Sequence, residues 1–183
     1  MARHYVIARY QEPIEWMTMV NLDNSNDFTI VQKELEKDNL NYSTRRDMPN
    51  VGRESSSWLW WIIANYCNLP DYVTFLQGNP LDHTSHGEIS KEPTKNYERH
   101  GQLLECTILG APHHTGLNMK FPLEIMGITP TPMIKFCMGA QFTVSRERLL
   151  KYSYPQYAEL FSYSVSEPNA AWELERCWET LYG

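Results

Sequence analysis

Runs of β-branched and aromatic residues near the start of the chain predict two strands with a helix between them. The strands are expected over residues 5–10 and 28–33. Between them, Pro13 ends a short turn and precedes an apolar segment over residues 14–20, which predicts a helix of about two turns. A strand, a helix and a strand in this order favour a parallel pair of strands.

The stretch over residues 49–83 has the clearest pattern in the chain and begins with a turn and a helix. Asn50 and Gly52 are turn residues, and the polar residues after them predict a helix that begins near Gly52. The spacing i, i+3, i+4, i+7 marks one buried face of this helix, formed by Leu59, Ile62, Ile63 and Tyr66. Further apolar surface comes from three tryptophans, Trp58, Trp60 and Trp61. We therefore expect the helix to be covered on more than one side.

A buried strand and a polar loop complete this stretch. Residues 72–76 are β-branched, aromatic or apolar, which predicts a strand inside a sheet. The loop over residues 77–83 follows directly and contains Gly78 and Pro80. In open α/β sheets, ligands bind in the crevice beyond the carboxyl ends of the strands. The loop is therefore a candidate binding site.

The remaining segments are less regular. Residues 34–48 are polar and predict a surface connection, and residues 84–120 predict long loops around an apolar island over residues 103–109 that is compatible with a strand. The last expected elements are a strand over residues 138–144, a short helix that begins at Ser145, and helices over residues 156–163 and 170–182.

Composition and charge narrow the class of protein. With 183 residues, of which 42% are hydrophobic, the chain is long enough for one well-buried core. A net charge of -6 argues against sequence-independent binding to the phosphates of nucleic acid. The four cysteines form no CxxC pair, and no segment has the pattern of a signal peptide or a membrane span. We expect a cytoplasmic protein with reduced thiols.

Several sequence words, spread from one end of the chain to the other, match one protein family. The words are Val6-Ile7-Ala8-Arg9-Tyr10, Asn50-x-Gly52-Arg53-Glu54, Phe75-Leu76-Gln77-Gly78-x-Pro80, Gly139-Ala140-Gln141-Phe142-x-Val144-Ser145 and Glu175-Arg176-x-Trp178. Through them the chain resembles a family of small proteins of unknown function that is regarded as glycosyltransferase-like. The resemblance implies a single GT-A-like α/β domain over residues 1–183, with three layers and a mostly parallel central sheet flanked by helices. It also implies transfer of a sugar from a nucleotide-sugar donor to an acceptor hydroxyl.

The resemblance and the local chemistry together nominate the site residues. The expected substrate-binding residues are Arg9, Asn50, Gly52, Arg53, Glu54, Gln77, Gly78 and Gln141. Arg53 follows Gly52 at a helix start, where the guanidinium and the free N–H groups favour a phosphate. The alternatives are a solvated helix start or an ion pair with Glu54. For Arg9, at the end of a strand, the alternative is a surface charge.

The expected catalytic residues are two carboxylates, Glu175 and Asp82. Glu175 would act as the general base for the acceptor hydroxyl, whereas the alternative is a solvated carboxylate on the last helix. Asp82 and His83, together with Asn79, would hold a divalent Mn²⁺ or Mg²⁺ ion.

One departure from the family pattern supports a second function. GT-A enzymes generally carry an acidic D-x-D motif after a central strand, and residues 77–83 contain none. The alternative is a non-catalytic binding or interaction module that keeps the fold without the metal motif. A zinc site is disfavoured, because the histidines are not framed by a cysteine pair or an HExxH motif.

Overall fold

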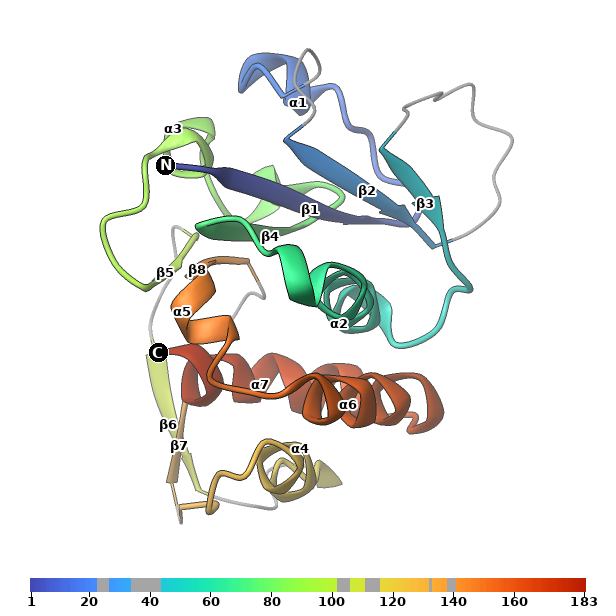
Figure 1. Cartoon of the computed structure of the whole chain (residues 1–183), viewed down its shortest axis with the longest axis vertical. Coiled ribbons are helices and arrows are strands. Elements are labelled where there is room, and N and C mark those ends of the chain that lie inside the picture. The colour runs from blue at the N-terminus through green and yellow to red at the C-terminus, as the bar shows by residue number, and fades with distance from the viewer. Residues whose placement is uncertain (23–26, 34–43, 102–105, 111–115, 132, 138–140) are drawn as a thin grey trace.

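A six-stranded mixed sheet with helices on both faces organises the structure (Figure 1). The computed structural model describes residues 1–22, 27–33, 44–101, 106–110, 116–131, 133–137 and 141–183. The strands of the main sheet are β1 (Arg3–Arg9), β2 (Phe28–Gln32), β3 (Arg45–Asp47), β4 (Tyr72–Gln77), β5 (Tyr97–Arg99) and β8 (Phe142–Ser145). A second, two-stranded sheet pairs β6 (Cys106–Gly110) with β7 (Met133–Cys137).

The strand order of the main sheet is β3-β2-β1-β4-β8-β5. β1 pairs in parallel with both β2 and β4, and β2 pairs in parallel with β3. β8 runs antiparallel to β4 and to β5. The parallel β1–β2 pair that the sequence predicts is confirmed. Ala8 lies opposite Val31 on one side and Gln77 on the other, so the carboxyl ends of β1, β2 and β4 meet at one edge.

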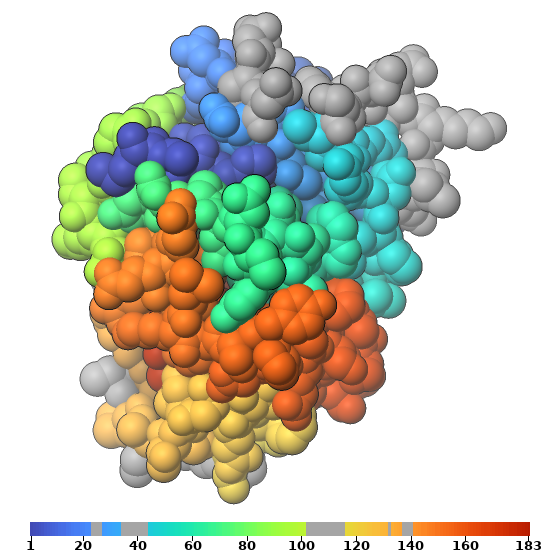
Figure 2. Space-filling model, viewed as in Figure 1, coloured from blue at the N-terminus to red at the C-terminus, as the bar shows by residue number. Residues whose placement is uncertain are grey.

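The two faces of the sheet pack against different helices. Side chains alternate between faces along a strand, so Val6 of β1 faces one core and Ile7 faces the other. The Val6 face is covered by α2 (Arg53–Asn65), and α6 (Tyr154–Ser166) and α7 (Ala170–Tyr182) lie beyond α2 (Figure 1). Figure 2 shows the same succession on the molecular surface, from the strands to α2, α6 and then α4 (Lys120–Ile125). The Ile7 face packs with residues of α1 (Trp16–Met19) and α3 (His86–Ser90).

Helix α2 is covered on two sides, as its apolar pattern predicts. Trp58 is 1% exposed and lies between the sheet and α7. Its ring centroid is 5.6 Å from that of Phe75 on β4, 5.6 Å from that of Phe142 on β8, and 6.1 Å from that of Trp178 on α7. Through Trp58, helix α2 is therefore packed against both the sheet and α7.

Several predictions for the less regular segments of the chain are incomplete. The prediction for residues 84–120 was mainly loops, but this span contains α3, β5 and β6. Residues 102–105 and 111–115 of the span are not among the residues that the structure describes. β6 overlaps the predicted apolar island. The polar connection over residues 34–48 contains β3, with residues 34–43 outside the description, and neither α4 nor β7 was predicted.

The predicted helix starts and ends agree better. α7 has the predicted bounds, and Ser145 caps α5 (Arg146–Leu149) by accepting a hydrogen bond from the Arg148 N–H at 3.3 Å. Cys67 and Cys177 are free thiols. In the described part of the chain, no helix has both the length and the apolar character needed to cross a bilayer.

Candidate functional site

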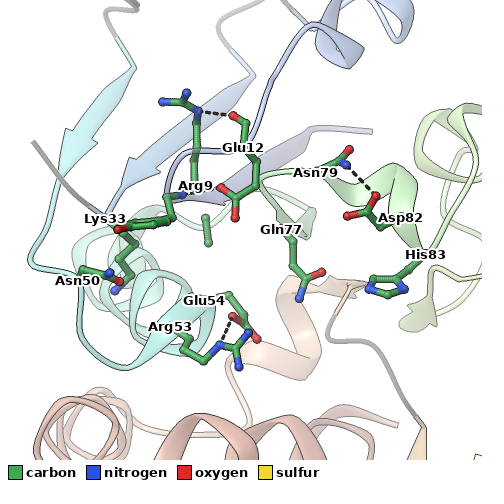
Figure 3. A pocket seen from close by; sticks show the side chains of 12 residues that line it. Arg9, Glu12, Lys33, Asn50, Arg53, Glu54, Gln77, Asn79, Asp82 and His83 are labelled. Atoms are coloured by element: carbon green, nitrogen blue, oxygen red, sulfur yellow. Dashed lines mark hydrogen bonds and ion pairs between the residues drawn. The ribbon is translucent and has the colours of Figure 1, made fainter. Parts of the chain in front are cut away.

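A hollow of about 450 Å³ lies at the carboxyl ends of β1, β2 and β4 (Figure 3). In the sheet, β2 and β3 lie on one side of β1, and β4, which follows them in the sequence, lies on the other side. The strand order therefore reverses at β1. Ligands of open α/β sheets bind at such switch points. The residues that line the hollow are Ala8, Arg9, Tyr10, Glu12, Lys33, Asn50, Arg53, Glu54, Gln77, Asn79, Asp82 and His83.

A second hollow of about 240 Å³ adjoins the first. The two share four lining residues, Arg53, Glu54, Gln77 and His83. Helix α7 supplies the rest of the second lining, which consists of Ala171, Trp172 and Glu175. The last helix of the chain thus completes a site that begins at the strand ends.

Most residues nominated from the sequence meet at these two hollows. Those in the larger lining are Arg9, Asn50, Arg53, Glu54, Gln77, Asp82 and His83, and Glu175 lies in the smaller one. Gln141 lines neither hollow. It is fully buried, and its amide nitrogen donates to the Pro80 carbonyl at 3.2 Å, which places it beneath the loop after β4.

Two consecutive residues with positive φ begin helix α2 at the rim of the hollow. Gly52 has φ 69° and Arg53 has φ 46°. A Cβ atom at Gly52 would lie 2.4 Å from the backbone oxygen of Ser164 on α6, so only glycine fits there. A positive φ is uncommon for a residue as large as arginine, and backbone strain of this kind clusters at functional sites.

The Arg53 side chain is accessible at this rim. It is 57% exposed, and its Nε lies 3.7 Å from a carboxylate oxygen of Glu54. Its guanidinium carbon also lies 5.4 Å from the ring centroid of Trp172 on α7. Arg53 therefore borders both hollows with its head group open to a ligand, and of the alternatives the structure favours a loose ion pair over a buried one.

Glu54 lies where the two hollows join. Its side chain is 14% exposed, and burial raises the pKa of its carboxyl group. Its own backbone N–H, the Arg53 charge and the Gln77 side chain oppose this rise, whereas the Glu175 charge adds to it. Figure 3 shows the Gln77 side chain reaching from the end of β4 toward Glu54. The junction therefore holds a carboxylate that is more basic than a solvated one.

The Arg9 side chain forms hydrogen bonds with other residues of the protein. It is only 6% exposed, and its Nε donates to the Glu12 carbonyl at 2.7 Å (Figure 3). One terminal nitrogen donates to Gln32 Oε1 at 2.6 Å. The alternative of a surface charge is wrong, because the side chain is buried. Arg9 fixes the end of β1 to β2 and to the loop after β1, and it contributes its charge to the hollow from behind.

Lys33, which the sequence interpretation missed, anchors the start of α2. It is 3% exposed, and its Nζ donates to the Val51 carbonyl at 2.8 Å and to the Ser56 hydroxyl. Burial lowers the pKa of its amine to about 8, although the Glu54 charge opposes this shift. A lysine directly after an apolar strand was the available signal, but its burial depends on tertiary packing.

Glu12 and Gly78 explain how two loops approach each other over the hollow. Glu12 Oε2 accepts a hydrogen bond from the Tyr10 N–H at 2.7 Å. A Cβ atom at Gly78 would lie 2.5 Å from that same oxygen. Trp16 donates from its indole nitrogen to the Gly78 carbonyl at 2.8 Å, which holds the loop in place. Gly78 is therefore needed for the close approach of the two loops, and Glu12 is a lining residue that was not nominated as a site residue from the sequence.

The predicted metal ligands lie at one side of the hollow. Asn79 donates from its amide nitrogen to Asp82 Oδ1 at 2.8 Å, so its nitrogen rather than its oxygen faces the carboxylate (Figure 3). Among the residues that the structure describes, no group of three or more His, Cys, Asp or Glu side chains is close enough to hold an ion. The Mn²⁺ or Mg²⁺ ion stays a prediction.

Comparison of the sequence with models of known families and with curated proteins, and comparison of the structure with solved structures, gave no significant match. The suspected family membership therefore stays a prediction.

Proposed function

We propose that the larger hollow binds a nucleotide-sugar and that the protein transfers the sugar to an acceptor hydroxyl in the smaller hollow. The observation that carries this proposal is the position of Arg53 and the start of α2 at the switch point between β1 and β4. This is the place where α/β folds bind nucleotides, and the proposed ligand has an anionic diphosphate that suits it.

The start of α2 offers three features to a diphosphate. No side chain caps the helix at Gly52, and Arg53 and Glu54 of its first turn line the hollow, so the positive end of the helix dipole lies at the rim. Arg53 presents an exposed planar fork that can bind two phosphate oxygens. Lys33 lies behind the turn and adds positive charge below pH 8. These groups would also stabilise the charge that develops on the leaving diphosphate.

The transfer can proceed as a single displacement between the two hollows. The acceptor oxygen attacks the anomeric carbon, and the bond from that carbon to the diphosphate oxygen breaks. The bonding electrons leave with the nucleoside diphosphate, and a carboxylate receives the acceptor proton.

We assign this proton transfer to Glu54. It lines both hollows, so it lies where donor and acceptor would meet, and its raised pKa makes it the stronger base. Glu175, nominated for this role from the sequence, lines only the acceptor hollow. Its charge raises the pKa of Glu54, which supports the base. Asp82 lies farther along the larger lining and has no step in this scheme.

A thermal-shift screen tests donor binding. Nucleoside diphosphates and their sugars are added singly, each with Mn²⁺ and again with EDTA. One nucleotide class should raise the melting temperature, since a ligand at 100 times its Kd stabilises the native state by about 2.7 kcal/mol. Because no metal step is used, the shift should persist in EDTA. Absence of a shift with every nucleotide would overturn the proposal.

The second candidate function is a binding module without transferase activity. The observation in its favour is that residues 77–83 lack the D-x-D motif and that the described residues include no three-ligand acidic cluster. Such a module would bind the nucleotide-sugar but release it intact. Nucleotide-sugar binding without release of nucleoside diphosphate, in the presence of acceptor sugars, would favour it.

A further inference from the structure

Trp172 is the exposed aromatic side chain that lines the smaller hollow. Helix α7 buries most of its apolar side chains, and Trp178 is 1% exposed, whereas Trp172 is 42% exposed. The fold does not use this indole in either core cluster of the described residues. The ring instead forms part of the smaller hollow, next to Glu175, which lies one helical turn further along α7.

The other walls of the hollow are hydrogen-bonding groups. Glu54 and Glu175 supply carboxylate oxygens that accept hydrogen bonds, and Gln77 and His83 supply side chains that can both donate and accept. A flat apolar ring beside several convergent acceptors fits a ligand with one C–H face and many hydroxyl groups. A sugar ring has this chemistry, since its axial C–H groups pack on an aromatic face and its hydroxyls donate to carboxylates.

Charge and size narrow the ligand further. The lining has two carboxylates and one arginine, and the Nε of that arginine, Arg53, already lies 3.7 Å from a carboxylate oxygen of Glu54. This balance of charge disfavours an anionic ligand. The volume of about 240 Å³ is below the range of about 300–1,000 Å³ that drug-sized ligands occupy. The hollow therefore suits one neutral ring rather than an extended or phosphorylated molecule.

We propose that the smaller hollow binds a neutral pyranose, which packs on the Trp172 ring and donates hydrogen bonds from its hydroxyls to the carboxylates of Glu54 and Glu175. The acceptor is then itself a sugar. Its role as acceptor rests on the proposed transferase function, whereas sugar binding at Trp172 does not. Trp172 is 42% exposed with the Arg53 guanidinium in place beside its ring, so indole surface remains for a ligand. Because Arg53 borders both hollows, the donor diphosphate and the acceptor ring would meet beside it.

Saturation-transfer NMR on the full chain tests the site directly. The probes are methyl glycosides of glucose, galactose, mannose and N-acetylglucosamine at millimolar concentration, with choline as a cationic probe of similar size. At least one glycoside should receive saturation at its ring C–H protons. Trp172→Ala should reduce that signal at least five-fold, and Trp172→Phe should keep a larger part of it, because an aromatic face remains.

Trp60→Ala is the matched control, since Trp60 is a partly buried tryptophan that lines a different hollow. It should leave the glycoside signal unchanged. The sugar proposal is overturned if no glycoside binds, if Trp172→Ala keeps the full signal while both variants remain folded, or if choline alone binds. Nucleotide titration separates the two claims. Glycoside binding without any nucleotide binding would keep the sugar site and reject the transferase.

Discussion

Replacement of Gly52 by alanine should destabilise the protein more than replacement of a glycine with the same backbone conformation elsewhere. At φ 69° an alanine enters the left-handed region, which costs about 1–2 kcal/mol. The new Cβ would also lie 2.4 Å from the Ser164 carbonyl oxygen, a backbone atom of α6 that can move only with its helix. Overpacking of this kind adds about 1–3 kcal/mol. We therefore expect a total loss of about 2–5 kcal/mol.

Gly127→Ala is the matched control for the backbone term. Gly127 has φ 73°, and the nearest atom to its added Cβ is the flexible Gln156 side chain at 3.5 Å. This variant should lose only about 1–2 kcal/mol. Urea unfolding of both variants measures the difference, provided that the slopes of the transitions are equal. Equal losses would refute the idea that α6 fixes the start of α2 through close backbone contact at Gly52.

Three further predictions concern titration and catalysis. Burial, reinforced by the Arg3 charge, lowers the pKa of His100 to about 4, so the unfolded chain binds more protons between pH 4 and 6.5. The free energy of unfolding should therefore fall by about 3 kcal/mol as the pH drops through this window. Urea unfolding of His100→Gln should not show this fall, and the same pH dependence in both proteins would contradict the prediction. Lys33 acts in the same direction at higher pH, because burial lowers its pKa from 10.5 to about 8: stability should rise as the pH increases from 8 to 10.5, and Lys33→Met should abolish the rise. Glu54→Gln should lower the rate of sugar transfer by a factor of about 10²–10⁴ and leave the affinity for the nucleotide unchanged. A larger loss of rate in Glu175→Gln would show that Glu175 is the general base.

The sequence predicted the central part of the sheet because its strands are continuous apolar runs. β1, β2 and β4 are buried on both faces, so their β-branched and aromatic residues form an unambiguous pattern. β3 and β5 were missed because they lie at the sheet edges and consist mainly of polar residues. Edge strands are specified by pairing with a neighbour, which leaves little trace in local hydrophobicity.

The candidate site shows a similar division. Arg53 and Glu54 were nominated from the resemblance together with helix-start chemistry, and both line the larger hollow. Lys33 could not be nominated, and Trp172 could not be singled out among the six tryptophans as a residue that could stack on a sugar ring, because tertiary packing decides which of these side chains are buried and which are exposed. Gln141 was nominated from the resemblance but lies beneath the loop rather than in a lining. Contacts between distant segments decide such cases.

The most direct test of the proposed donor site is the affinity of Arg53→Lys for a nucleoside diphosphate, measured by calorimetry in EDTA. Lysine keeps the charge but loses the fork, so affinity should fall by about 10–100-fold, equivalent to about 1.4–3 kcal/mol. The melting temperature should change little, because the Arg53 side chain is exposed and its ion pair is loose. Arg146→Lys is the control, since Arg146 pairs with Asp71 at 2.9 Å and lines neither hollow. Unchanged affinity with a lowered melting temperature in Arg53→Lys would show that Arg53 is structural and would contradict the donor site.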